Sequence, residues 1–264
     1  MHNVILFALL ASICTWFITA LGSAVVLFFK APKQNILNLM LGFSAGVMIA
    51  ASFWSLLQPA IERAEQTLET PAYIVVAFGF ALGAIFICIS DKVVSHIMHK
   101  NVRHIGCDKL KRIIVLVLSI TLHNIPEGFA VGVAFGVLKE NSDFSAISGA
   151  IAIAVGIGLQ NFPEGAAVSL PLRREGYSRK KCIFWGQISA IVEPIAATIG
   201  AALVGIVETI LPFALSFAAG AMIFVSVHEL IPECQENRQQ KPYMSTIGIL
   251  CGFLVMMILD VMLG

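Results

Sequence analysis

Long apolar runs follow one another along the chain and are separated by short polar stretches. A helix that crosses a lipid bilayer needs about 20 mainly apolar residues. Runs of that kind occupy residues 5–29, 36–59, 72–90, 113–138, 144–172, 182–207, 211–231 and 243–263. The pattern therefore predicts an all-α integral membrane protein with eight transmembrane helices in contact with the lipid bilayer.

Composition supports this prediction and limits the number of domains. Hydrophobic residues make up 58% of the 264 residues and charged residues only 12%, whereas soluble proteins contain about 25% charged residues. Eight spans and their connections use nearly the whole chain. We therefore expect one transmembrane domain over residues 1–264, with a cytoplasmic loop at residues 91–112 between the third and fourth spans, and no separate soluble catalytic domain.

Positive charge orients the predicted spans. All but two of the 17 Lys and Arg residues fall in the loops after the first, third, fifth and seventh spans, the exceptions being Arg63 and Lys139. Because cytoplasmic loops carry an excess of Lys and Arg, both termini should face the outside or the periplasm. We expect a location in the plasma membrane, or in the inner membrane of a bacterium. No basic stripe is left over for nucleic acid.

Acidic residues are distributed differently from basic ones. Glu127, Glu164, Glu193 and Glu229 lie inside predicted spans, and Asp260 lies near the end of the last one. No Lys or Arg occurs inside a span to pair with them. An ionisable group at membrane depth costs a few kcal/mol and usually marks a pathway or a site. The pattern therefore predicts a membrane protein that binds protons or external cations.

A repeated motif gives this site a position. The fourth span contains the segment HNIPEG at residues 123–128, and the fifth contains QNFPEG at residues 160–165. Residues four apart lie one turn apart on the same helix face, so His123 should lie over Glu127 and Gln160 over Glu164. Each proline removes a backbone donor and should loosen the preceding turn. Loosened polar turns in two spans predict an ion site near the middle of the membrane.

The side chains narrow the choice of ion. Imidazole nitrogen and carboxylate oxygen together suit a divalent transition metal, with Zn²⁺ first, followed by Fe²⁺, Mn²⁺ and Cd²⁺. Met48 in the second span would add a thioether if it faces the same cavity. Glu193 and Pro194 repeat the pairing of carboxylate and proline in the sixth span. This makes the sixth span the expected third wall of the site.

With these motifs the chain resembles the ZIP (Zrt-, Irt-like protein) family of divalent-metal transporters, and within it the GufA-like branch. The resemblance implies a 3+2+3 arrangement of the eight helices with inverted repeats, a homodimer, and an elevator-like motion. Some relatives carry Asp or His where this chain has the neutral Gln160 and Asn161, so one tightly bound metal is expected. The resemblance assigns metal binding to Met48, His123, Asn124, Glu127, Gln160, Asn161, Glu164 and Glu193.

Two further groups of residues offer metal ligands. His228 and Glu229 begin a HExxH-like segment, but the residue four after His228 is Pro232, so the second histidine of a metallopeptidase is missing. We expect a transient metal site on the cytoplasmic exit path here, with simple packing and capping as the alternative. The loop between the third and fourth spans should either collect metal or be an ordinary solvated loop. Its histidines are His96, His99 and His104.

These observations predict a transporter that imports Zn²⁺ into the cytoplasm. The metal would be the cargo, and neither an enzymatic activity nor a prosthetic group is expected. An intramembrane zinc-dependent hydrolase is one alternative, and it would need three protein ligands and a general base. A proton-coupled carrier of small solutes is the other. The paired motif of His or Gln, Asn, Pro, Glu and Gly argues against both alternatives.

Overall fold

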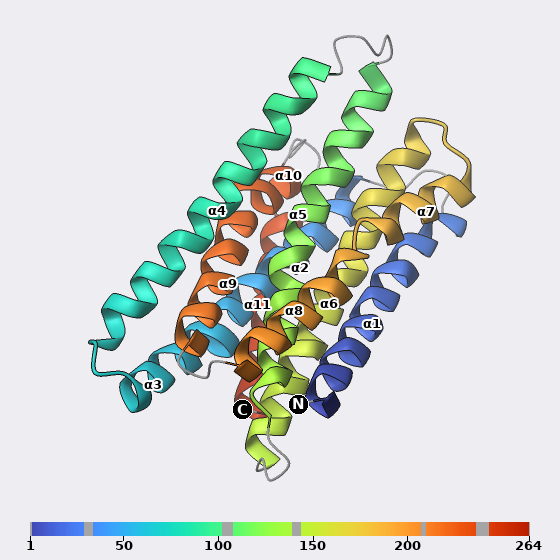
Figure 1. Ribbon diagram of the computed structural model, residues 1–264. Helices are drawn as coiled ribbons and strands as arrows, with labels where there is room; N and C mark the ends of the chain where they lie inside the picture. The colour runs from blue at the N-terminus through green and yellow to red at the C-terminus, as the bar shows by residue number, and fades with distance from the viewer. Residues whose placement is uncertain are drawn as a thin grey trace.

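The fold is helical throughout the part of the chain that the structure describes. The computed structural model describes residues 2–28, 34–101, 108–138, 144–206, 210–235 and 243–263, and all regular structure in these ranges is helical (Figure 1). Both chain ends lie at the same end of the helix bundle (Figure 1). The prediction of an all-α protein is confirmed.

The helices combine into continuous rods. In chain order they are α1 His2–Ala24, η1 Val25–Leu27, α2 Gln34–Ala51, η2 Ser52–Leu57, α3 Gln58–Thr67, α4 Ala72–Asn101, α5 Asp108–Gly136, α6 Phe144–Arg174, α7 Arg179–Ile188, α8 Val192–Ile206, α9 Leu211–Val225, η5 Ser226–Leu230, α10 Ile231–Gln235 and α11 Met244–Leu263. The short 3-10 helix η1 continues α1. The π-helical turns η2 and η5 join α2 to α3 and α9 to α10. We count α7 and α8 as one interrupted rod, because only the turns at residues 189–191 separate them, and eight rods then result within the described ranges.

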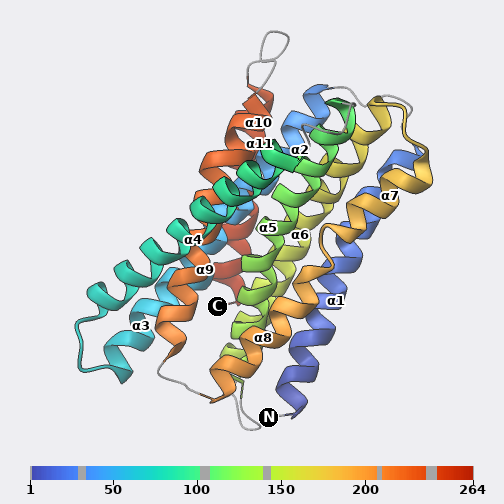
Figure 2. The ribbon, with the colours of Figure 1, turned by 45° about the horizontal axis from the view of Figure 1, so that its top comes forward.

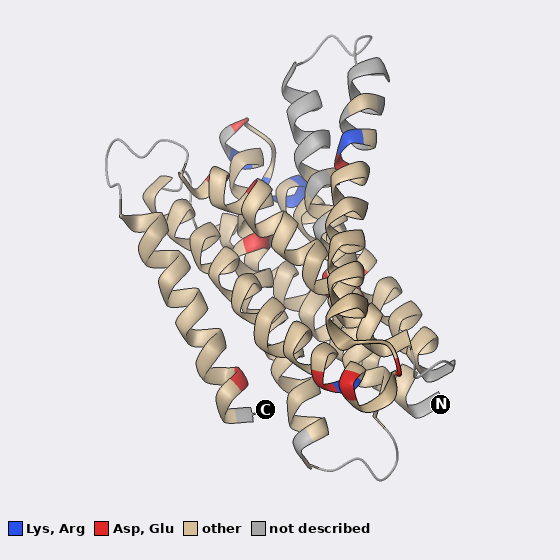
Figure 3. Ribbon diagram, turned by 90° about the vertical axis from the view of Figure 1, so that its left-hand side faces the viewer, with Lys and Arg blue, Asp and Glu red and all other residues tan. Residues whose placement is uncertain are grey.

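Seven stretches of these rods are long and apolar enough to cross a membrane. They are Val4–Leu27, Gln34–Thr67, Ala72–Val93, Ala146–Arg173, Arg179–Val204, Leu211–Gln235 and Met244–Met262. Each contains one of the predicted spans or nearly all of it. Among the residues coloured in Figure 3, Lys and Arg lie towards the ends of the bundle and not in its middle. The crossing of α5, which carries the remaining predicted span, stays a prediction.

Two predicted boundaries are wrong. The loop expected at residues 91–112 is helical at both of its ends, because α4 extends to Asn101 and α5 begins at Asp108. The sixth span, expected as one helix over residues 182–207, is broken between α7 and α8. An apolar run marks the part of a helix that lies in the lipid. The helix can continue beyond that part, because it satisfies its own backbone hydrogen bonds in water as well as in lipid.

The rods pack in pairs, and the pairing is symmetric. The most extensive contacts join α1 to α6, α2 to α11, α4 to α9, and α5 to α8. Suppose that the first, second and third rods change places with the sixth, seventh and eighth, and α5 with α6. The pair α1–α6 then becomes α8–α5, and the pair α2–α11 becomes α9–α4. The π-helical turns lie in the second and seventh rods, which the same operation exchanges. This packing agrees with the internal repeat that the resemblance implies. Figure 2 shows α1, α8, α5 and α6 on one side of the bundle and α3, α4 and α9 on the other.

A row of glycines brings α5 and α8 into close contact. Gly128, Gly132 and Gly136 are spaced by four residues and face the backbone of α8. A Cβ atom added at Gly132 would lie 2.1 Å from the carbonyl oxygen of Ala197. Small residues at such spacing let two membrane helices approach backbone to backbone. The same contact at Gly128 meets Glu193, so it places the carboxylate of α8 beside that of α5.

We expect Gly132→Ala to lower the thermal unfolding temperature of the detergent-solubilised protein by several degrees. The added methyl group can be accommodated only if the backbones of α5 and α8 separate, and this loses packing along both helices. Gly149→Ala on α6 is the matched control, because no atom lies within 4 Å of the added methyl group. Equal unfolding temperatures for the two variants would show that this helix contact is not tight.

Candidate metal site between α5, α6 and α8

The two repeated motifs lie in the middle of α5 and α6. Pro126 and Pro163 are both inside their helices, which continue without interruption. The prolines therefore do not break their helices, and the loosening of the turns before them stays a prediction. A proline removes a single N–H donor, and here dense packing against neighbouring helices keeps the rest of each helix intact.

The interruption lies in the sixth rod instead. Residues 189–191 form turns between α7 and α8, before Glu193 and Pro194. Side chains from other helices donate hydrogen bonds to carbonyl groups at this break: Asn124 Nδ2 donates to the carbonyl of Ser189 at 3.0 Å, and Trp16 Nε1 donates to that of Gln187 at 2.9 Å. The break places Glu193 in the first turn of α8, where the helix dipole favours a carboxylate.

Glu127 forms the first part of the site. Its side chain is fully buried, and Gln160 Nε2 of α6 donates a hydrogen bond to its Oε1 atom at 2.6 Å. Gln160 was predicted to lie over Glu164 on its own helix. It also bonds a carboxylate on the neighbouring helix α5. The side chain of His123, predicted to lie over Glu127, is outside the described side chains.

Glu193 forms the second part. It is fully buried, and Asn161 Nδ2 donates to both of its carboxylate oxygens at 2.9 Å. Thr15 on α1 donates a third hydrogen bond from Oγ1 to Oε2 at 2.6 Å. Thr15 was not predicted, because a single threonine in an apolar helix gives no signal of its own.

Glu164 connects the site to α2. Ser44 Oγ donates to Glu164 Oε1 at 2.7 Å, and both residues are buried. Ser44 was also missed, for the same reason as Thr15. Met48 lies one turn further along α2 and is fully buried. Because residues four apart share a helix face and α2 packs against α6, Met48 lies on the side of α2 that carries Ser44.

Four buried oxygen atoms in this region have no hydrogen-bond partner among the described residues. They are Asn124 Oδ1, Glu127 Oε2, Gln160 Oε1 and Asn161 Oδ1. A buried polar atom without a partner costs about 1–3 kcal/mol, so four within two adjacent motifs call for an explanation. Carboxylate and amide oxygens are ligands for divalent cations. The donor set therefore fits a bound cation.

Acidic, histidine and cysteine residues alone do not form this site. Among the described side chains, no three of these residues lie close enough together to hold a metal ion. The amides explain the difference, because Gln160 and Asn161 each stand between two elements and bond a carboxylate that would otherwise face the other carboxylates.

Three of the other predicted ligands have described side chains, namely His96, His228 and Glu229. His228 is exposed on the π-helical turn η5, where its ring packs against Phe224 at 5.1 Å between centroids. Glu229 beside it is half-buried. His96 lies exposed on α4 and not in a loop, which corrects the prediction, while the side chain of His99 and the whole of His104 lie outside the described part. The role of these residues stays a prediction.

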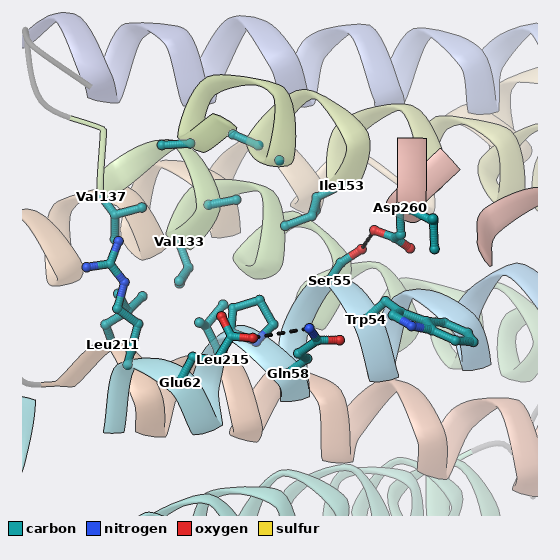
Figure 4. Close-up of a pocket in the computed structure, with 17 residues that line it drawn as sticks. Trp54, Ser55, Gln58, Glu62, Val133, Val137, Ile153, Leu211, Leu215 and Asp260 are labelled. Atoms are coloured by element: carbon teal, nitrogen blue, oxygen red, sulfur yellow. Dashed lines mark hydrogen bonds between the residues drawn. The ribbon is translucent and has the colours of Figure 1, made fainter. Parts of the chain in front are cut away.

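A cavity of about 420 Å³ opens at the end of the bundle that carries both chain ends (Figure 4). Ser55 on η2 donates a hydrogen bond to Asp260 on α11 across one side of it, and Gln58 Nε2 donates to Glu62 Oε1 at 3.1 Å on another. Val133 on α5 lines the same cavity, six residues beyond Glu127, which corresponds to about 9 Å along the helix.

Buried apolar residues separate this cavity from the site. Ala130 and Ile157 lie between the two along α5 and α6, and Met48 lies between them along α2. All three side chains are almost inaccessible to solvent. The end that we expect to face the outside is therefore closed above the site in this conformation.

Comparison with known proteins places relatives of this chain among zinc transporters. The family profile described as "ZIP Zinc transporter" matches residues 3–112 and 107–260. The chain is 36% identical to zinc transporter ZIP11 of Homo sapiens over 341 residues, covering 100% of this chain and 99% of the relative. It is 33% identical to zinc transporter GufA of Myxococcus xanthus, covering 97% and 98%. It is 35% identical to zinc transporter ZIPB of Bordetella bronchiseptica, covering 98% and 82%.

Proposed function

Because the chain belongs to the ZIP family of zinc transporters, we propose that it imports Zn²⁺ through the site between α5, α6 and α8. It is a multi-pass membrane transporter and not an enzyme. We also propose import into the cytoplasm, a location in the plasma membrane and a homodimer. These parts of the proposal rest on the charge pattern of the loops and on the family resemblance. Cd²⁺, Fe²⁺ and Mn²⁺ are further candidate cargoes, because the same ligands bind them in the general affinity order.

The four oxygen atoms without partners carry this proposal. Glu127 and Asn124 on α5 would bind the metal together with His123 one turn away. On α6 the ligands would be Gln160, Asn161 and Glu164. Glu193 would complete the third wall, and Met48 would close the site on the side of α2. Ionised carboxylates and a neutral imidazole supply the charge and the electron pairs that a divalent cation needs when it loses its water.

Gln160 would stabilise the carboxylate of Glu127 whenever no metal is bound. Its Nε2 group lies on Glu127 at 2.6 Å, where it partly neutralises a buried carboxylate in place of a cation. An arriving metal would take over that carboxylate oxygen. Gln160 could then turn its amide, so that Oε1 becomes a ligand. On release the amide would return to Glu127, so neither state leaves the carboxylate without a partner.

The path of the metal follows from the positions of the polar groups. The cavity beside Ser55, Glu62 and Asp260 would receive the hydrated ion at the outer end. The apolar layer at Met48 would have to open for the ion to reach the central site. On the cytoplasmic side, His228 and Glu229 would hold the ion briefly before release.

Transport by the purified protein tests this proposal directly. Proteoliposomes loaded with a zinc-sensitive dye should take up Zn²⁺, and a panel of competing divalent ions should rank the cargoes. Empty liposomes and liposomes containing the Glu127→Gln variant serve as controls. Hydrolysis of a substrate, or flux of an organic solute without metal, would instead favour one of the two alternative functions.

We expect the rate of uptake to fall severalfold as the external pH decreases from about 7 to about 5. Protonation of a carboxylate or of His123 removes a metal ligand, so both types of group change the affinity in the same direction. Initial rates at a fixed concentration of free zinc, with a constant internal pH, measure the effect. A steady rise towards acid pH would contradict competition and favour import driven by protons.

A further inference from the structure

The first helix contributes to the central site without supplying a metal ligand of its own. We propose that Thr15 on α1 is a positioning residue that orients the amide of Asn161 so that its oxygen faces the metal. This inference rests on the proposed function, because it concerns the same site. It assigns a role in metal binding to a helix that contains none of the repeated motif.

The hydrogen bonds around Asn161 determine the orientation of its amide. Three acceptors surround Nδ2: both carboxylate oxygens of Glu193 at 2.9 Å and the carbonyl oxygen of Thr15 at 3.3 Å. An amide nitrogen only donates and an amide oxygen only accepts. The reversed orientation would place Oδ1 against three acceptors. The oxygen therefore points away from Glu193, and it is one of the four oxygen atoms without a partner.

The hydroxyl of Thr15 donates a hydrogen bond to the carboxylate of Glu193, which in turn accepts hydrogen bonds from the amide of Asn161. Thr15 Oγ1 lies 2.6 Å from Glu193 Oε2, and both side chains are buried. A short hydrogen bond to a carboxylate is stronger than one between neutral groups. The hydroxyl also lies 3.0 Å from the carbonyl of Ser12 in its own helix, but the contact with Glu193 is the shorter of the two. Without this hydroxyl, the carboxylate of Glu193 would keep, within the described part of the chain, only the hydrogen bonds of Asn161 and Thr19, and the orientation of the Asn161 amide would be less firmly fixed.

Close packing keeps α1 in place for this role. A Cβ atom added at Gly165 would lie 2.1 Å from the carbonyl oxygen of Thr19, and one added at Gly22 would lie 2.0 Å from that of Phe162. The backbones of α1 and α6 therefore touch one and four residues beyond Asn161, and the two helices run side by side in Figures 1 and 2. This close packing holds the part of α1 that follows Thr15 against α6.

Equilibrium binding of Zn²⁺ to the full-length protein in detergent tests the inference. Thr15→Val removes the hydroxyl but keeps the shape, and it should weaken binding about tenfold, as is typical when a group that orients metal ligands is lost. Thr15→Ser restores the hydroxyl and should bind within about twofold of the unmodified protein. Ser12→Ala is the control, because the buried Ser12 hydroxyl bonds only the carbonyl of Leu9 in its own helix among the described residues.

A double-mutant cycle separates positioning from general destabilisation. In an Asn161→Ala background, Thr15→Val should cause no further loss of affinity, because the two residues act through the same ligand. Additive losses, or failure of Thr15→Ser to restore binding, would overturn the inference. If Thr15→Val does not fold, as judged by size-exclusion chromatography, Thr15→Ala and Thr15→Ser provide the same comparison.

The outcome for Glu127→Gln tells the two proposals apart. If that variant binds Zn²⁺ as the unmodified protein does, the central site itself is misplaced and the proposed function fails with it. If Glu127→Gln loses binding while Thr15→Val retains it in full, only the positioning role of Thr15 is wrong.

Discussion

Glu127→Gln is expected to reduce zinc uptake by roughly a hundredfold. Glu127 is fully buried in the described structure, with one oxygen bonded to Gln160 and the other without a partner. Losing the charge of a buried ion pair costs about 3 kcal/mol, and each 1.4 kcal/mol is about tenfold in affinity. Glutamine keeps the size of the side chain, so the protein should still fold. Initial rates of ⁶⁵Zn uptake into proteoliposomes measure the effect.

The control for this experiment is an acidic residue outside the site. Glu65 is exposed on α3, and Glu65→Gln should transport zinc at the rate of the unmodified protein when equal amounts are reconstituted. Normal uptake by Glu127→Gln would remove the central carboxylate from the mechanism. A loss of uptake in both variants would instead point to an effect of surface charge on the arrival of zinc.

Asn161→Asp is expected to raise the number of tightly bound zinc ions from one to two. The unmodified site contains the carboxylates of Glu127, Glu164 and Glu193, so two divalent ions would leave a net charge of +1 in a region where unbalanced charge is costly. With a fourth carboxylate, the site and two bound divalent ions together carry no net charge. Asn161 already lies 2.9 Å from both oxygens of Glu193, so the new carboxylate would face an existing one and a second ion could bridge them.

The same variant should be less stable without metal. Two carboxylates at this distance repel each other unless a cation or a proton lies between them. Thermal unfolding with a chelator and with excess Zn²⁺ should therefore show a larger gain in unfolding temperature on metal binding for Asn161→Asp than for the unmodified protein. Asn161→Ala removes the amide without adding charge, and should bind no second ion. Isothermal titration calorimetry counts the ions, and two equally tight ions in the unmodified protein would contradict the charge argument.

The sequence by itself determined the features that depend on local patterns. Apolar runs of the right length predict helices that cross a membrane, because the backbone must satisfy its hydrogen bonds within each span. The burial of Glu127, Glu164 and Glu193 followed from their positions inside such runs. The repeated segments at residues 123–128 and 160–165 predicted that two helices contribute to one site, and Gln160 does bond Glu127 across the two.

The tertiary structure decided the features that depend on neighbouring helices. One such feature is the break before Glu193. The others are hydrogen bonds between residues far apart in the chain: Gln160 to Glu127, Thr15 to Glu193, and Ser44 to Glu164. A hydroxyl in an apolar helix looks the same whether it bonds its own backbone or a carboxylate on another helix. Only the packing of small residues, which brings α1 against α6 and α5 against α8, selects between these two roles.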